Sequence, residues 1–287
     1  MSENFRFRDI PHTKHFISID SDQRDPVRYP DASDFQIVLF NELKNVLYIK
    51  LLDAQIPVSD FNVHEFNNGF VLTDNGTDYP LQLPVGDYDA NKLITELTNL
   101  VTPLATTNVY TFSIVNGQLR IQGTGGVLPY EFKFAPPAQF ADSIRQASGD
   151  SEQEIVLNQS ARQILGFNIA NYISVGGPIG EILSPNKINL TGEKAVFLYL
   201  SSNAHDSYPM VESKSQGGRD TFYRIPLSAP RNTYTFFQND YNFSYLLGTT
   251  GRRARKFTVQ LRTNDIRRLY NTRGLPYCIQ LEIGSSI

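Results

Sequence analysis

The clearest structural signal in the chain is the stretch YTFSIVNGQLRIQ, residues 110–122. Its central Asn116-Gly117 is the dipeptide that tolerates positive φ in a type I′ turn. A two-residue loop at this point fixes the cross-strand register and puts four apolar side chains on one face, in the pairs Ile114–Leu119 and Phe112–Ile121. The stretch therefore predicts a β-hairpin with one buried face.

A second hairpin is predicted upstream, over residues 70–83, with its turn at Asn75-Gly76. The register again places four large side chains on one face, in the pairs Leu72–Tyr79 and Phe70–Leu81. Pro80 lacks a backbone N–H, so the second strand is expected at the edge of its sheet.

A single long helix is predicted between the two hairpins, over residues 89–102. Asp89 is the expected N-cap and Pro103 follows the last turn. Five apolar residues recur at helical spacing on one stripe: Leu93, Ile94, Leu97, Leu100 and Val101. A short helix is also expected around residues 161–165, before Gly166-Phe167.

Short β-type runs separated by turn residues recur through the rest of the chain, which is typical of an antiparallel sandwich or barrel. Because the link of residues 41–45 is short, strands 35–40 and 46–54 are expected to pair with each other. The alternating strands 256–261 and 277–283 are likewise expected to pair. Strand 194–200 (KAVFLYL) is apolar on both faces, which indicates burial on both sides or a contact between subunits.

Composition limits the possible functions. The chain has 287 residues, 40% hydrophobic and 19% charged, so it can bury a core. Its 26 basic and 29 acidic residues give a net charge of -3, unlike the positive excess of most nucleic-acid-binding proteins. One cysteine excludes an intrachain disulfide and multi-cysteine zinc sites. Neither a signal-peptide core nor a membrane-spanning run is present, so secretion by its own signal is not expected.

Catalytic and metal-binding motifs are absent from the sequence, so no catalytic, cofactor-binding or metal-binding residue is assigned. The run Asp20-Ser-Asp-Gln-Arg-Asp25 departs from a calcium loop at the fifth, sixth and twelfth positions and is expected to be a solvated loop. His12 and His15 fall on opposite faces of a strand, whereas His64 and His205 are isolated. Cys278 is expected to be a buried, inert thiol.

Basic residues gather near the C-terminus, in residues 252–273. Asp265 is the only acidic residue in this segment. The set is Arg252, Arg253, Arg255, Lys256, Arg262, Arg267, Arg268 and Arg273. Two interpretations are open: a basic surface for nucleic acid or an acidic partner, and a loop with the solvated face of one strand and a helical turn.

The order of motifs resembles a family of icosahedral DNA-virus capsid proteins, the penton (vertex) and minor capsid proteins of virophages, polinton-like viruses and nucleocytoplasmic large DNA viruses. The resemblance spans most of the chain. It rests on Phe16-Ile-Ser-Ile-Asp20, Arg24-Asp25, Tyr29-Pro30, Asp34-Phe35, Lys44-Asn45-Val46, Ala54-Gln55-Ile56-Pro57, Val85-Gly86-Asp87-Tyr88, the 110–122 hairpin, Phe132 and Phe134, Leu165-Gly166-Phe167, Ile225-Pro226 and Leu281-Glu282-Ile283. The basic segment has no counterpart in this pattern.

This resemblance implies a mainly β protein, an antiparallel jelly-roll sandwich with a small inserted α/β subdomain. The jelly roll is expected in residues 1–84 and 171–287, and the insertion in residues 85–170. The implied function is that of a structural protein of the virion, a penton without enzymatic activity or cofactor. Its partners would be four further copies in a homopentamer and the major capsid protein of the same virus.

Alternatives remain at this point. One is a minor or cement capsid protein, and a second is a β-sandwich module that attaches to host glycans through aromatic residues such as Tyr29, Tyr241 and Tyr245. A glycosidase would need two carboxylates about 5–9.5 Å apart, and no predicted strand pair places two acids on one inner face. Contact with nucleic acid or with a host surface is compatible with the sequence. The candidate segments for contact with other copies or neighbouring capsomers are strand 194–200 and the polar stretches 1–14 and 202–220.

Overall fold

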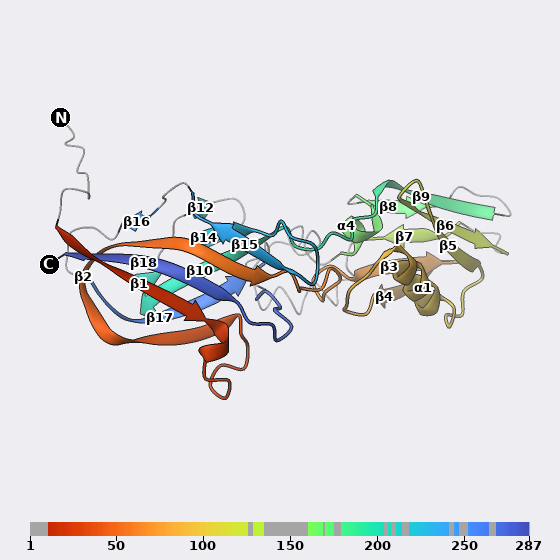
Figure 1. The fold of residues 1–287 in the computed structure, drawn as a ribbon. Helices are drawn as coiled ribbons and strands as arrows, with labels where there is room; N and C mark the ends of the chain where they lie inside the picture. Colours follow the sequence, from red (N-terminus) through yellow and green to blue (C-terminus); the bar gives the residue numbers. More distant parts are fainter. Residues whose placement is uncertain are drawn as a thin grey trace. The chain divides into compact units, whose positions relative to one another are not determined.

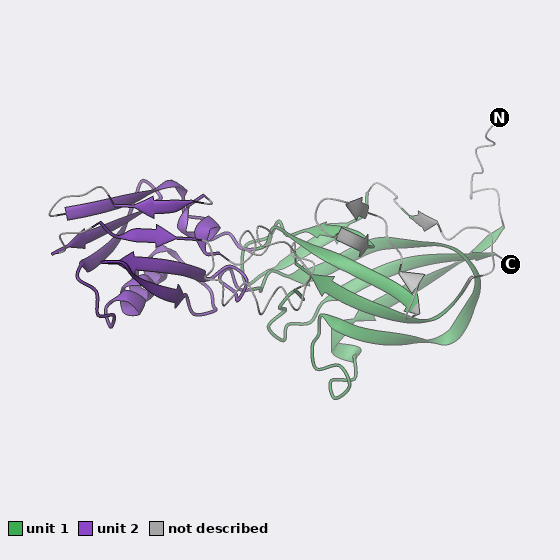
Figure 2. Ribbon diagram, turned by 180° about the vertical axis from the view of Figure 1, so that it is seen from behind, with its two compact units in different colours: residues 1–60, 193–287 green, residues 61–192 purple. Residues whose placement is uncertain are grey.

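Two compact units make up the computed structural model of the chain, which describes residues 11–125, 129–134, 160–168, 170–174, 179–203, 206–207, 211–213, 218–240, 244–246, 252–263 and 268–286. Unit 1 comprises residues 1–60 and 193–287, and unit 2 comprises residues 61–192 (Figure 2). Each unit has its own hydrophobic core. Unit 2 is thus an insertion into the chain of unit 1.

Nine described strands of unit 1 are joined in one antiparallel sheet that is folded into two layers, called here the first and second sheets, and two short strands pair separately (Figure 1). Its main strands are β1 (His12–Asp20), β2 (Asp34–Pro57), β10 (Ala195–Asn203), β14 (Tyr223–Pro226), β15 (Tyr234–Gln238), β17 (Arg252–Arg262) and β18 (Cys278–Ser286). Shorter elements are the 3-10 turn η2 (Ser21–Gln23) and the strands β11 (Asp206–Ser207), β12 (Val211–Ser213), β13 (Gly218–Thr221) and β16 (Tyr245–Leu246).

The long strand β2 belongs to both sheets. Its first half pairs with β17, whereas its second half pairs with β18 on one edge and β15 on the other. The first sheet therefore has the order β1, β18, second half of β2, β15, and the second sheet has the order first half of β2, β17, β10, β14. Traced along the chain, these eight segments have jelly-roll connectivity. The expected fold class, a mainly β antiparallel jelly roll with an α/β insertion, is confirmed.

One predicted pairing inside unit 1 is wrong. Residues 35–40 and 46–54 do not form a hairpin, because the link between them stays extended and continues as β2. Asn45 adopts a positive φ of 50°, and the register with β17 shifts on both sides of Ala254. These irregularities bend β2 from one sheet to the other instead of reversing it, as bulges do in strongly curved strands.

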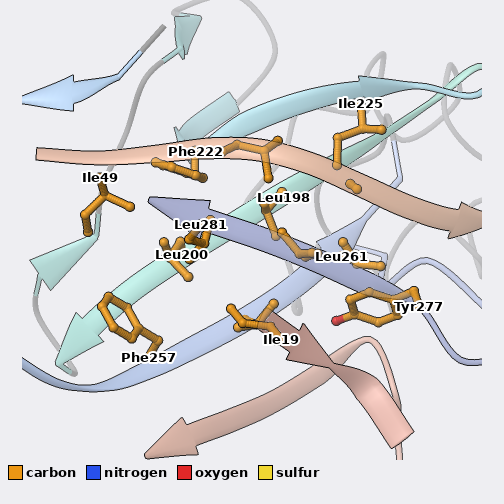
Figure 3. Close-up of a cluster of buried hydrophobic side chains, with 14 of the residues drawn as sticks. Ile19, Ile49, Leu198, Leu200, Phe222, Ile225, Phe257, Leu261, Tyr277 and Leu281 are labelled. Atoms are coloured by element: carbon orange, nitrogen blue, oxygen red, sulfur yellow. The ribbon is translucent and has the colours of Figure 1, made fainter. Parts of the chain in front are cut away.

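The predicted pairing of strands 256–261 and 277–283 is also wrong. β17 lies between β2 and β10 in the second sheet, whereas β18 lies between β1 and β2 in the first. Their alternating apolar residues instead face each other across the core. Phe257, Leu261 and Leu281 meet there with Ile19, Leu198 and Tyr277 (Figure 3).

The described residues of unit 2 form two antiparallel sheets and the helix α1 (Ala90–Val101). One sheet has the order β4 (Thr77–Gln82), β3 (Gly69–Asp74), β7 (Glu131–Lys133), β8 (Asn171–Ile173), and the other has the order β5 (Val109–Val115), β6 (Gln118–Thr124), β9 (Ile179–Lys187). A short helix, α4 (Arg162–Leu165), precedes Gly166.

Local predictions for unit 2 are confirmed. Ile114 pairs with Leu119, and Leu72 pairs with Tyr79. The four turn residues of the two Asn-Gly hairpins all have positive φ. β4 lies at the edge of its sheet, and Asp89 caps α1 by accepting a hydrogen bond from the Lys92 backbone N–H.

The limits of unit 2 differ from the expected insertion of residues 85–170. The hairpin β3–β4 pairs with β7 and contributes Phe70 and Leu72 to the core of unit 2. Similarly, β8 and β9 pair with β7 and β6. Residues 61–84 and 171–192 therefore pack with the insertion in the structure. That each part folds as a separate domain stays a prediction.

A buried carboxylate in unit 2 should make stability depend on pH. Asp74 accepts hydrogen bonds from the Asn108 backbone N–H at 3.0 Å and from the Thr107 hydroxyl at 2.7 Å. Burial opposes ionisation, but these hydrogen bonds outweigh it and lower the pKa of Asp74. The resulting stabilisation is complete above the unfolded-state pKa of about 4 and is lost as pH falls through the lower folded-state pKa.

Replacing Asp74 with Asn should reduce the free energy of unfolding near neutral pH by about 1–3 kcal/mol, because the charged acceptor is lost. The loss should shrink on acidification, which urea unfolding at a series of pH values would measure. The exposed Glu65 provides the matched control Glu65→Gln. Equal pH profiles for the two variants would contradict the role given to Asp74.

Candidate functional surfaces

In the acidic loop that begins at Asp20, which was compared with a calcium site, the charged side chains bind backbone groups of the loop itself. Asp20 accepts a hydrogen bond from the Asp22 backbone N–H, and Asp25 accepts from the backbone N–H groups of Val27 and Arg28. Arg24 donates to the carbonyls of Ser21 and Tyr29. Among the described residues, no three His, Cys, Asp or Glu side chains gather as metal ligands would.

The candidate histidine and cysteine residues lie apart from one another. On β1, the His12 ring packs edge-on against Tyr48, whereas His15 Nε2 lies 2.9 Å from the Ser285 hydroxyl. His64 is buried in a turn of unit 2, and His205 lies outside the described residues. Cys278 is free but only half-buried, which corrects the expectation of a buried thiol, because it lies on the outer face of the first sheet.

The tyrosines weighed for glycan binding do not form a described site. Tyr29 is half-buried against the core of unit 1, with Arg28 5.3 Å from its ring centroid. Tyr241 lies outside the described residues, and only the backbone placement of Tyr245, in β16, is described.

The basic residues between 252 and 273 are dispersed over unit 1. Arg253 and Arg255 are exposed at the start of β17, and Arg262 lies on the outer face of the second sheet. Arg268 is buried, and Arg273 is exposed in a turn. Arg267 lies outside the described residues, and only the backbone of Arg252 is described. The described members therefore do not form one continuous basic surface, although Arg253, Arg255 and Lys256 lie together near the start of β17.

Arg268 belongs to a buried charged cluster that sequence reasoning missed. Its guanidinium binds the Asp60 carboxylate through both terminal nitrogens, one of them at 2.9 Å from Asp60 Oδ1. It also lies 3.4 Å from Glu193 Oε1. Asp60 and Glu193 are the unit 1 residues on either side of the insertion, so one guanidinium joins the two points at which the chain leaves and re-enters unit 1.

The outer face of β10 is apolar although it points away from the core. Val196, Leu198 and Leu200 are buried in the sandwich, whereas Phe197 and Tyr199 alternate with them and are half-buried on the other side. The Arg262 guanidinium lies 4.9 Å from the centroid of the Tyr199 ring. The Tyr199 hydroxyl is buried without a hydrogen-bond partner within the described part of the chain.

A third surface lies where β2 bends between the sheets. We name it the bend surface, and it consists of Val38, Phe40, Glu42, Lys44, Arg253, Arg255 and Lys256. The Phe40 side chain is 99% exposed and Val38 is 58% exposed. Val38 is the register partner of Lys256, and Arg253 lies 3.7 Å from Glu42. The surface therefore combines exposed apolar groups with a local excess of positive charge.

Only one of these surfaces could be anticipated from the sequence. Because residues 194–200 (KAVFLYL) are apolar on both faces, they predicted that the outer face of β10 is also buried or contacts another subunit. The exposure of Phe40 was not predicted, because Phe40 was expected to be the last residue of strand 35–40, next to the link of residues 41–45. No helix among the described residues is long and apolar enough to cross a membrane.

Comparisons with known proteins give a match to a family model and similarities to solved structures. Residues 8–121 match the model of a family of unknown function (DUF5901). No curated protein sequence matches the chain. Among solved structures, the chain is similar to the penton protein of mavirus, with 11% sequence identity and a TM-score of 0.46. That similarity covers 96% of this chain and 100% of the mavirus chain.

Proposed function

We propose that this chain is a structural capsid protein of an icosahedral DNA virus and that it assembles as a homopentamer, the penton, at the five-fold vertices of the virion. The proposal is supported by the motif resemblance and by the jelly-roll connectivity of unit 1. Its work would be the burial of surface between copies and against the major capsid protein, without catalysis.

The observation that carries the proposal is the outer face of β10. A ring of identical subunits requires a heterologous contact, in which one surface of each copy meets a different surface of the next. Phe197 and Tyr199 supply apolar area outside the core, and Arg262 lies over the Tyr199 ring. Aromatic and arginine side chains are the residues that dominate binding energy at protein interfaces. A neighbouring copy would also supply an acceptor for the Tyr199 hydroxyl.

Light scattering after size-exclusion chromatography tests this function. We expect the purified chain to have the mass of a pentamer, whereas a monomer or dimer would favour the minor or cement capsid role.

A Tyr199→Glu variant should weaken the contact roughly 30-fold or more and dissociate the pentamer, because a charge would be buried at the ring contact. Val27→Ser, which changes an exposed aliphatic side chain in the loop after η2, is the matched control and should remain pentameric. A pentamer that survives Tyr199→Glu would exclude the outer face of β10 as the ring contact.

A further inference from the structure

Charge is distributed unevenly along the strands of unit 1. The start of β1, the end of β18, the bend of β2 and the start of β17 meet at one end, as the register of Thr13, Ser285, Val46 and Arg252 requires. This end carries the bend surface. The loop of residues 21–33 lies at the other end, beyond Asp20, and exposes Asp22, Asp25 and Asp31.

The bend surface is strongly positive for its size. Four cations, Lys44, Arg253, Arg255 and Lys256, accompany a single acid, Glu42. Glu42 is matched by Arg253 at 3.7 Å, whereas Lys44, Arg255 and Lys256 have no ion-pair partner among the described residues. The whole chain has a net charge of -3, so this positive end is a local feature.

Apolar side chains project from the same surface. Phe40 is almost fully exposed, and Val38 lies directly across from Lys256. Cross-strand partners have Cβ atoms about 5 Å apart, so the methyl groups of Val38 and the alkyl stem of Lys256 share one apolar strip. Exposed aromatic and aliphatic groups surrounded by lysine and arginine are the pattern of proteins that lie on anionic membranes.

We propose that the bend surface docks unit 1 onto an anionic phospholipid surface, with Phe40 and Val38 entering the headgroup–acyl boundary and Lys44, Arg255 and Lys256 binding lipid phosphates. Charge complementarity selects an anionic partner. The apolar pair selects lipid over nucleic acid, because an aliphatic side chain such as Val38 gains nothing from a phosphodiester backbone. No membrane-spanning segment is needed, since the contact is interfacial.

The ring of the proposed function would strengthen this contact. In a cyclic assembly all copies face the same way, so their bend surfaces would point to one side and bind a membrane together. This gain rests on the proposed pentamer, whereas the affinity of one bend surface does not. The Tyr199→Glu variant separates the two, because it should still bind anionic vesicles, only more weakly.

Vesicle sedimentation tests the proposal with the full chain. We expect it to bind phosphatidylcholine vesicles that contain phosphatidylserine, to bind phosphatidylcholine alone much less, and to dissociate as salt increases. The double variant Arg255→Gln, Lys256→Gln should lower the partition coefficient of a single subunit roughly 25-fold, at about fivefold for each charge. Its control is Arg28→Gln with Arg273→Gln, which removes the same charge from exposed turns elsewhere.

The apolar contribution is tested at unchanged charge. Phe40→Ser should weaken vesicle binding about fivefold, because the ring no longer enters the boundary region. Phe236→Ser is the control, since Phe236 is 75% exposed on β15, near the acidic end of unit 1. Circular dichroism should show native folding for both variants.

Three results would overturn the proposal: equal binding to neutral and anionic vesicles, equal losses in the variants and their controls, and full vesicle binding by Phe40→Ser. Gel-shift binding of duplex DNA that depends on Arg255 and Lys256, without vesicle binding, would assign the bend surface to nucleic acid instead.

Discussion

An Arg268→Ala variant should lose about 3–5 kcal/mol of stability, enough to unfold unit 1 at much lower urea concentrations. Arg268 is 7% exposed and contacts two acids, Asp60 and Glu193, which are themselves largely buried. Removing the guanidinium takes a counter-charge away from two carboxylates in a low-dielectric site. The cost of an uncompensated buried charge exceeds the net value of the pair, which explains the size of the expected loss.

The same experiment can separate charge from geometry. Arg268→Lys keeps the positive charge but cannot bind both oxygens of Asp60 at once, so its loss should lie between that of the alanine variant and the wild type. Arg273→Ala is the matched control in the same segment, where the side chain is exposed, and should change stability by less than about 0.5 kcal/mol. Equal urea midpoints for Arg268→Ala and Arg273→Ala would show that the buried cluster contributes nothing.

The position of the cluster gives it a second consequence. Asp60 and Glu193 lie 133 positions apart in sequence (193 − 60), and the whole of unit 2 is inserted between them. Because Arg268 binds both Asp60 and Glu193, it links the two ends of the unit 1 chain between which unit 2 is inserted. An insertion of this length costs loop-closure entropy that grows only slowly with length, so one buried cluster can offset a useful share of it.

Local structure was predictable where one dipeptide or one stripe dictates the geometry. Asn75-Gly76 and Asn116-Gly117 each fix a turn, and the turn fixes every pair in the hairpin. Asp89 and the apolar stripe fix the start and the buried face of α1. These signals act over a few residues, so tertiary contacts have little power to override them.

Long-range pairing was not predictable to the same extent. An alternating strand such as β17 or β18 fits any neighbour with the same alternation, and only the closed sandwich selects its partners. Asn45 resembles a turn residue, yet a single left-handed residue in an extended segment bends a strand without reversing it. The clustering of Arg268 with Asp60 depends on residues 208 positions apart, for which a single sequence carries no signal.

A Gly166→Ala variant should destabilise unit 2 by about 2–5 kcal/mol, because two separate costs fall on one methyl group. Gly166 ends α4 with a left-handed φ of 79°, and the following backbone N–H, that of Phe167, donates to the Arg162 carbonyl at 2.7 Å. This is the Schellman arrangement, which favours glycine. An added Cβ would also collide with the backbone carbonyl of Asn186, whose own N–H donates to the Gly166 carbonyl at 2.9 Å.

The collision cannot be relieved by a rotamer change, since its partner is main chain. Moving α4 away would instead disturb Phe167, whose ring stacks on Phe134 at 4.7 Å between centroids in the core of unit 2. Gly274→Ala is the matched control, because Gly274 has nearly the same φ, 74°, but no heavy atom within 4 Å of an added Cβ. It should cost only the backbone strain, about 1–2 kcal/mol. Urea unfolding measures the loss of stability in each variant, and the difference between the two losses is the cost of the collision. A difference near zero would mean that α4 can move away from Asn186 without cost. Packing would then not constrain the Leu165-Gly166-Phe167 motif.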